Sequence, residues 1–296
     1  MRHITVLLHE AVAGLSPKSG GIYVDGTLGA GGHTEEICKL APKSTIIGID
    51  ADIDAIERAK VRLAAMPCTL ITSNNFNDKI SQILDENEID EVDGVVLDLG
   101  MSSDQLDRSG RGFSFLRDEP LQMTMESISA TNTLTAEKIV NSFTEEQLAT
   151  VIYGYGEEKY SRRIARAIVE ARNETPIKTT GQLADIIKRS VPMMYRHGKT
   201  HPATKTFQAL RIAVNDELER LEKTLEDSFK RLKIGGRLSI ISFHSLEDRI
   251  VKRFMRAKAS EGQGILINKK PLIPTEEEIK SNPRSRSAKL RILEKK

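Results

Sequence analysis

Short apolar runs alternate with segments of helical periodicity over the first hundred residues. The apolar runs predict strands at 22–24, 45–49, 68–72 and 94–97. Between them, apolar positions spaced three or four residues apart predict helices at 33–40, 52–63 and 79–84. An alternation of strand and helix is typical of a parallel sheet that is covered by helices on both faces. The chain is therefore predicted to have an α/β fold.

The alternation stops in the middle of the chain. Nearly every segment from Thr135 to Lys230 has helical periodicity, and one long helix is expected from Pro202 to Phe229. Strand patterns then return at 237–243, 265–268 and 289–293. We therefore predict one α/β core made of residues 1–112 and 216–296, which an all-helical domain at 113–215 interrupts.

Positive charge is concentrated in two segments of a nearly neutral chain. Segment 159–205 contains eleven lysines and arginines but only three acids, a local charge of +8 within a total of +2, so the rest carries −6. Residues 282–296 contain six lysines and arginines and one acid, Glu294. Clustered positive charge indicates a polyanionic partner, whereas solvated helix faces are the alternative explanation.

Neither a membrane nor a metal is predicted as a partner. The apolar run Ile4–Leu8 is too short for the core of a signal peptide, and no eighteen apolar residues follow one another. Cys38 and Cys68 show neither a pairing pattern nor a metal-type spacing, which fits a reducing compartment, so we expect a cytoplasmic protein. His197 and His201 stand four residues apart, but no neighbouring side chain completes a set of metal ligands.

A glycine-rich segment, DGTLGAGGHT, joins the first strand to the first helix. Backbone N–H groups at a helix N-terminus bind anionic ligand groups, and glycines allow a close approach; a merely tight turn is the alternative. Asp50 ends the second strand and is placed to accept hydrogen bonds from the ribose of a nucleoside cofactor. A dinucleotide site needs a third glycine where Thr34 stands, whereas Asp25 suits the amine of an amino-acid-bearing cofactor. These features favour S-adenosylmethionine over a nicotinamide dinucleotide.

Three further positions follow from the same architecture. Phe76, after the third strand, is placed to pack on an adenine, although a core role would explain it equally well. Asp98 ends the fourth strand at the edge where open α/β sheets bind ligands, which favours a functional over a structural role and makes it the first catalytic candidate. His244, just before a helix that Ser245 is expected to cap, is a second catalytic candidate; an ordinary strand-end histidine is the alternative.

Six segments in a fixed order resemble the RsmH family, also called MraW, over essentially the whole chain. They are HITVLLHE, DGTLGAGGHT, DLGMSSDQLD, RGFSFLRDEPLQMTM, ISFHSLEDRIVK and NPRSRSAKLRIL. The resemblance implies a Rossmann-like methyltransferase core that depends on S-adenosylmethionine and methylates the exocyclic N4 amine of a cytosine in the decoding region of small-subunit (16S) ribosomal RNA. It also implies cofactor contacts at Gly31, Gly32, His33, Asp50, Phe76, Asp98 and Gln105.

The helical segment is expected to hold RNA, as naked small-subunit ribosomal RNA or as the 30S particle. The cations expected to contact phosphates are Arg162, Arg163, Arg166, Lys188, Arg189, Arg196 and Lys199. The oligomeric state is left open, a homodimer included. Three other functions are possible. Thr34 argues against an oxidoreductase, and the retained strand-end acids argue against a non-catalytic RNA-binding protein. The basic segments argue against a methyltransferase for proteins or small molecules.

Overall fold

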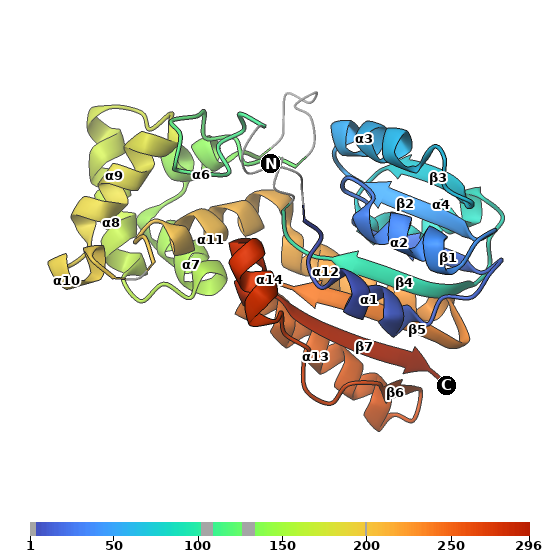
Figure 1. Cartoon of the computed structure of the whole chain (residues 1–296). Coiled ribbons are helices and arrows are strands. Elements are labelled where there is room, and N and C mark those ends of the chain that lie inside the picture. Colours follow the sequence, from blue (N-terminus) through green and yellow to red (C-terminus); the bar gives the residue numbers. More distant parts are fainter. Residues whose placement is uncertain (1–3, 102–108, 126–133, 199) are drawn as a thin grey trace. The chain divides into compact units, whose positions relative to one another are not determined.

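The computed structural model describes residues 4–101, 109–125, 134–198 and 200–296. The chain folds into two compact units (Figure 1). The core unit contains Met1–Gly100 and Leu218–Lys296, and the helical unit contains Met101–Glu217. This division is compatible with the insertion expected at 113–215.

A seven-stranded sheet forms the centre of the core unit (Figure 1). Its strands lie in the order β3-β2-β1-β4-β5-β7-β6. The strands β1 to β5 pair in parallel, whereas β7 is antiparallel to both β5 and β6. The bounds are β1 Ile22–Asp25, β2 Thr45–Asp50, β3 Thr69–Asn74, β4 Val92–Asp98, β5 Leu232–Ser242, β6 Gly264–Leu266 and β7 Lys289–Lys295. The predicted mostly parallel sheet is confirmed.

Helices cover both faces of this sheet, because each strand buries apolar side chains in both directions. On one face, α4 (Ile80–Glu86), α12 (Glu217–Arg231) and α13 (Ser245–Ser260) pack side chains against the strands. On the other face lie α1 (Leu8–Leu15), α2 (Gly32–Leu40) and α3 (Ile53–Leu63). The short elements η1 (Asn77–Lys79), α14 (Glu276–Ser281) and η2 (Pro283–Ser287) complete the unit. This arrangement confirms the predicted Rossmann-like layers.

The helical unit contains no extended strand among its described residues. Its helices are α6 Ala136–Ser142, α7 Glu145–Gly156, α8 Ser161–Glu174, α9 Thr180–Ser190, α10 Met193–Arg196 and α11 Thr204–Asn215. Aliphatic side chains at helical spacing, such as Ile164 and Ile168 on α8, form a core of their own. Capping boxes stabilise the starts of α7, at Thr144, and of α9, at Thr179.

The structure corrects two expectations. The long helix expected from Pro202 to Phe229 is interrupted, because Asp216 adopts a left-handed conformation with φ of 49° and separates α11 from α12. Cys38 on α2 and Cys68 before β3 are joined in a disulfide with their Cα atoms 5.5 Å apart, so treating them as unpaired was wrong. The reducing compartment inferred from unpaired cysteines therefore loses its basis. In the described part of the chain, no helix is long and apolar enough to cross a membrane.

Two glycines of α7 provide a matched test of packing inside the helical unit. A Cβ at Gly156 would lie 2.6 Å from the carbonyl O of Lys205, whereas a Cβ at Gly154 would have no atom within 4 Å. We expect Gly156→Ala to destabilise the unit by about 1–3 kcal/mol through steric overlap. Gly154→Ala should instead stabilise it by about 0.5–1 kcal/mol, because alanine favours the helix. Urea unfolding followed by circular dichroism would measure both; shifts of the same sign would contradict the close contact.

Candidate active site

Three carboxylates lie at the carboxyl ends of neighbouring parallel strands. Asp25 ends β1, Asp50 ends β2 and Asp98 ends β4. The strand β1 pairs with β2 on one side and with β4 on the other, so the chain reverses its direction of strand addition here. Open α/β sheets bind ligands in the crevice outside such a switch point. In the structure these three acids lie at one edge of the sheet, as predicted from the sequence.

The glycine loop between β1 and α2 is shaped by backbone conformations that favour glycine. Gly29 and Gly31 have φ of 51° and 75°, and Gly31 forms the N-cap of α2. A Cβ at Gly32 would lie 1.9 Å from Oγ1 of Thr5, so this position is glycine because the N-terminal segment crosses the loop. Because α2 begins shortly after the carboxyl end of β1, the partial positive charge of its N-terminus lies at the same edge as the acids.

Asp50 is held by the loop that follows β1. Its Oδ2 accepts a hydrogen bond of 2.8 Å from the N–H of Gly29, and its Oδ1 accepts one of 2.9 Å from the N–H of Asp52. Burial raises the pKa of this carboxyl, against these two hydrogen bonds. Each carboxylate oxygen can accept a second hydrogen bond, so the pair can also receive the two hydroxyls of a ribose.

Asp25 is 1% exposed. Its Oδ2 accepts a 2.7 Å hydrogen bond from the hydroxyl of Thr34, and its Oδ1 lies 3.3 Å from the N–H of Thr27. Burial, together with the charge of Asp50, raises the pKa of Asp25 to about 6 despite these hydrogen bonds. Thr34 occupies the position where a dinucleotide site would have glycine, and the structure uses it to bind Asp25.

Asp98 carries a buried carboxylate oxygen at the end of β4. Among the described residues nothing hydrogen-bonds its Oδ1, while its backbone N–H donates to Oγ1 of Thr27 at 2.6 Å. Burial raises the pKa of Asp98 well above its usual value, and the charges of Asp25 and Glu247 raise it further. A buried acceptor without a donor is costly, so the arrangement favours a ligand that brings a donor or a positive charge.

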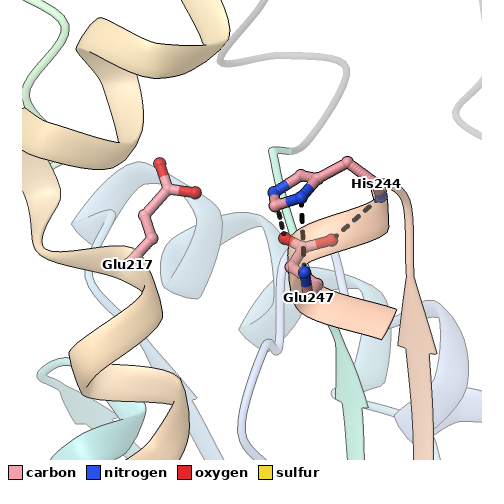
Figure 2. Close-up of side chains that lie close together, drawn as sticks. All are labelled: Glu217, His244 and Glu247. Atoms are coloured by element: carbon pink, nitrogen blue, oxygen red, sulfur yellow. Dashed lines mark hydrogen bonds and ion pairs between the residues drawn. The ribbon is translucent and has the colours of Figure 1, made fainter. Parts of the chain in front are cut away.

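His244 and Glu247 form the start of α13 (Figure 2). His244, not Ser245, is the N-cap: its Nδ1 lies 3.4 Å from the N–H of Glu247, and Oε2 of Glu247 accepts from the N–H of Phe243 at 2.8 Å. His244 Nε2 lies 3.2 Å from Oε1 of Glu247. Glu217, also drawn in Figure 2, accepts two hydrogen bonds from Arg211 of its own unit. Both ring nitrogens of His244 thus face Glu247, so a catalytic role for this histidine stays a prediction.

A family model matches residues 1–296 of this chain and describes the MraW methylase family. The chain belongs to the MraW methylase family. Three relatives, each called "Ribosomal RNA small subunit methyltransferase H", match over 99% of both chains. They come from Clostridium botulinum (49% identical), Paenibacillus sp. (46%) and Acetivibrio thermocellus (46%). The predicted resemblance and the predicted methyltransferase are therefore confirmed, and S-adenosylmethionine is the methyl donor that the loop and the strand-end acids fit.

The other cofactor residues implied by the MraW resemblance lie in different surroundings. Phe76 follows β3, and the guanidinium of Arg220 lies 3.9 Å from its ring centroid. Arg220 also donates to Oδ1 of Asp78 at 2.9 Å, so it covers one face of the ring. His33 is buried, with Nε2 3.2 Å from the carbonyl O of Val6. Gln105 lies outside the described residues. Cofactor contacts at these positions stay predictions.

Most of the cations predicted to hold RNA lie on α8 and α9. Arg162, Arg163 and Arg166 are exposed on α8, and Lys188 and Arg189 are exposed in the last turn of α9. Arg166 lies 3.5 Å from Glu145 in an exposed ion pair. The Arg196 guanidinium donates to the carbonyls of Val191 and Arg189, so it also holds the end of α9. Lys199 is outside the described residues.

Four residues of the site escaped the sequence analysis. Thr27 was expected only as a loop residue, and Thr34 only as a helix residue in the place of a glycine, although hydroxyls beside a strand-end acid indicate buried hydrogen bonds. Glu247 stands three residues after His244, which is the spacing of a capping box, and this pattern could have identified it. Arg220 left no local signal, because only the packing of α12 brings it onto Phe76.

Proposed function

We propose that this MraW-family methyltransferase transfers the methyl group of S-adenosylmethionine to the exocyclic N4 amine of a cytosine in the decoding region of small-subunit (16S) ribosomal RNA. The relatives named above carry a small-subunit ribosomal RNA methyltransferase name, which supports the substrate class. The Oδ1 of Asp98 at the switch point, buried and without a hydrogen-bond partner among the described residues, supports an amine acceptor. Ribosomal RNA as the substrate implies that the enzyme acts in the cytoplasm.

The residues that would hold the cofactor are those of the sheet edge. Asp50 would bind the ribose hydroxyls and Asp25 the amine of the methionine moiety, with Gly31 and Gly32 at the positive end of α2 beside them. The cofactor supplies the electrophilic methyl group, so the protein must supply alignment rather than a strong nucleophile.

Asp98 would orient and deprotonate the target amine. The lone pair of a cytosine amine is delocalised into the ring, so an acceptor that binds one N–H helps to turn the lone pair toward the methyl carbon. As the nitrogen–carbon bond forms, the carbon–sulfur bond breaks and the nitrogen loses a proton, which Asp98 is placed to receive. The positively charged cofactor, when bound at the same edge, would offset the charges of Asp25 and Glu247. It would thereby lower the pKa of Asp98, so that the carboxyl is ionised and can accept the proton.

The helical unit would hold the RNA around an unstacked base. Its exposed arginines and lysines on α8 and α9 suit contacts to phosphates, which fix position without reading sequence. The target cytosine must leave the stack or already be single-stranded to reach a pocket at the sheet edge.

The function is tested by locating the transferred methyl group. The enzyme is incubated with methyl-labelled S-adenosylmethionine and small-subunit particles, or with the naked RNA, and the RNA is mapped by mass spectrometry. We expect one labelled cytosine, with the label on N4, in the decoding region, and transfer slower by about a hundredfold or more when Asp98→Asn replaces the wild type. Label in ribosomal protein or in another nucleotide would instead identify a methyltransferase for a different substrate.

A further inference from the structure

A cavity of about 380 Å³ lies in the core unit between the end of β5 and the basic tail of the chain. We call it the tail cavity and define it by the residues that line it, among them Phe243, His244, Ile273, Ile279, Arg286 and Lys289. Its volume falls in the range of about 300–1,000 Å³ that is typical of small-molecule and cofactor pockets. None of the predicted cofactor residues that the structure describes lines it.

The cavity combines an apolar wall with positive charge. Ile273 is 67% exposed, and it faces the cavity together with the half-buried Phe243. The lining includes two cations and no acid. Lys289 is paired with Asp248 at 3.1 Å, whereas the exposed Arg286 has no ion-pair or hydrogen-bond partner within the described ranges. One cationic group is therefore available to an anion beside a surface that suits a flat, apolar ring.

The backbone around the tail cavity is held in place before any ligand arrives. Leu272 and Leu290 exchange two backbone hydrogen bonds of 3.0 and 2.9 Å, which tie the wall that carries Ile273 to β7. Ser285 and Ala288, on either side of Arg286, are buried, and they fix η2 so that Arg286 points outward. A site that is ordered in advance loses little entropy when it binds a ligand.

The cavity adjoins the edge of the sheet that carries the methyl-transfer acid. Ile241 of β5 pairs with Asp98 of β4, and Phe243 follows two residues later. A Cβ at Gly100, just past Asp98, would lie 3.6 Å from the Phe243 ring. Because neighbouring strands are about 5 Å apart, a ligand in the cavity would sit next to the position proposed for the target base.

We propose that the tail cavity binds one nucleotide of the RNA strand adjacent to the methylated base, with its phosphate at Arg286 and its base against the apolar wall. This inference rests on the proposed function, because it assigns a second contact of the same RNA substrate. Basic grooves that follow the backbone, combined with rings on which bases stack, are the usual way in which proteins hold single-stranded nucleic acid. The tail cavity thus accounts for two of the six cations at 282–296, Arg286 and Lys289.

The charge of the cavity is tested by binding of a fluorescent ten-residue oligocytidylate to the full-length protein over a range of salt concentrations. We expect Arg286→Ala to weaken binding about fivefold and to lower the slope of log affinity against log salt by about 0.7. Lys269→Ala, which removes an exposed cation outside the cavity, is the control and should bind within twofold of the wild type. Equal affinities and slopes for these two variants would overturn the assignment.

The apolar wall is tested by Ile273→Ser, and the control is Ile234→Ser, which changes an isoleucine that is also largely exposed (82%) but lies outside the cavity. Ile273→Ser should weaken oligocytidylate binding without changing the salt slope, and ultraviolet crosslinking should place a base on Phe243. Crosslinks confined to the helical unit would refute the cavity. If the wild type methylates ribosomal RNA and Arg286→Ala does so with unchanged KM, only the cavity assignment fails. If the wild type binds the oligonucleotide in the cavity but methylates no ribosomal RNA, only the proposed function fails.

Discussion

Asp98→Asn should reduce methyl transfer to small-subunit RNA by about 10²- to 10⁴-fold while the protein remains folded. Asparagine fills the same volume at the end of β4 but cannot receive the proton that the amine loses. The loss should appear in kcat more than in KM, because the substrate still binds through the other contacts. Single-turnover transfer of labelled methyl, together with a thermal unfolding curve for each variant, measures both effects.

Asp93→Asn is the matched control for this prediction. Asp93 lies on the same strand but at the opposite end, where its Oδ2 accepts from the N–H of Ile22 and pairs with Lys233. Those contacts lower the pKa of Asp93, so its substitution should cost stability at neutral pH but little activity. Turnover by Asp98→Asn at the wild-type rate would remove Asp98 from the mechanism.

Asp25→Asn should weaken binding of S-adenosylmethionine by about 30-fold or more, because the cofactor amine loses its carboxylate. The same substitution should stabilise the free enzyme at neutral pH. The folded state keeps the Asp25 proton up to a pKa of about 6, whereas the unfolded chain releases it near 3.8. The contribution of Asp25 to stability is therefore fully present below pH 4 and falls by about 3 kcal/mol as the pH rises through this window. Asparagine does not titrate, so it removes this pH-dependent loss of stability.

Calorimetric titration with S-adenosylmethionine between pH 5 and 8, and urea unfolding at pH 4 and 7, would measure both consequences. For the wild type, affinity should decrease below about pH 6 as Asp25 takes up its proton. Asp54→Asn, which removes an exposed carboxylate at the start of α3, should follow the wild type in both experiments. An Asp25→Asn variant that binds the cofactor as tightly as the wild type would show that the amine lies elsewhere.

Sequence patterns predicted well those features that depend on residues close together in the chain. Each of the strands β1, β2 and β4 is a short apolar run that ends in an acid, and parallel pairing necessarily brings such ends to one edge. The position of Asp25, Asp50 and Asp98 therefore followed from strand order alone. The capping box at Thr144 is equally local, since its two residues stand three apart.

The features that were missed depend on contacts between distant segments or on single backbone conformations. The apolar spacing of the expected long helix continues through Asp216, so the spacing could not predict that this residue adopts a left-handed conformation and ends α11. Cys38 and Cys68 are separated by thirty residues and meet only because tertiary packing brings the end of α2 beside the residue before β3. Arg220 reaches Phe76 from another part of the chain, and no spacing rule predicts such a pair.

The helical unit separates β4 from β5 along the chain, although these two strands are hydrogen-bonded neighbours in the sheet. Pairing them requires closure of a very long loop, which makes contact order high and folding slow. The helical unit has a hydrophobic cluster of its own, so it can collapse early and shorten the distance that the remaining chain must search. During synthesis, β5 leaves the ribosome only after the whole insertion. The acid at the end of β4 thus acquires its buried surroundings among the last steps of maturation.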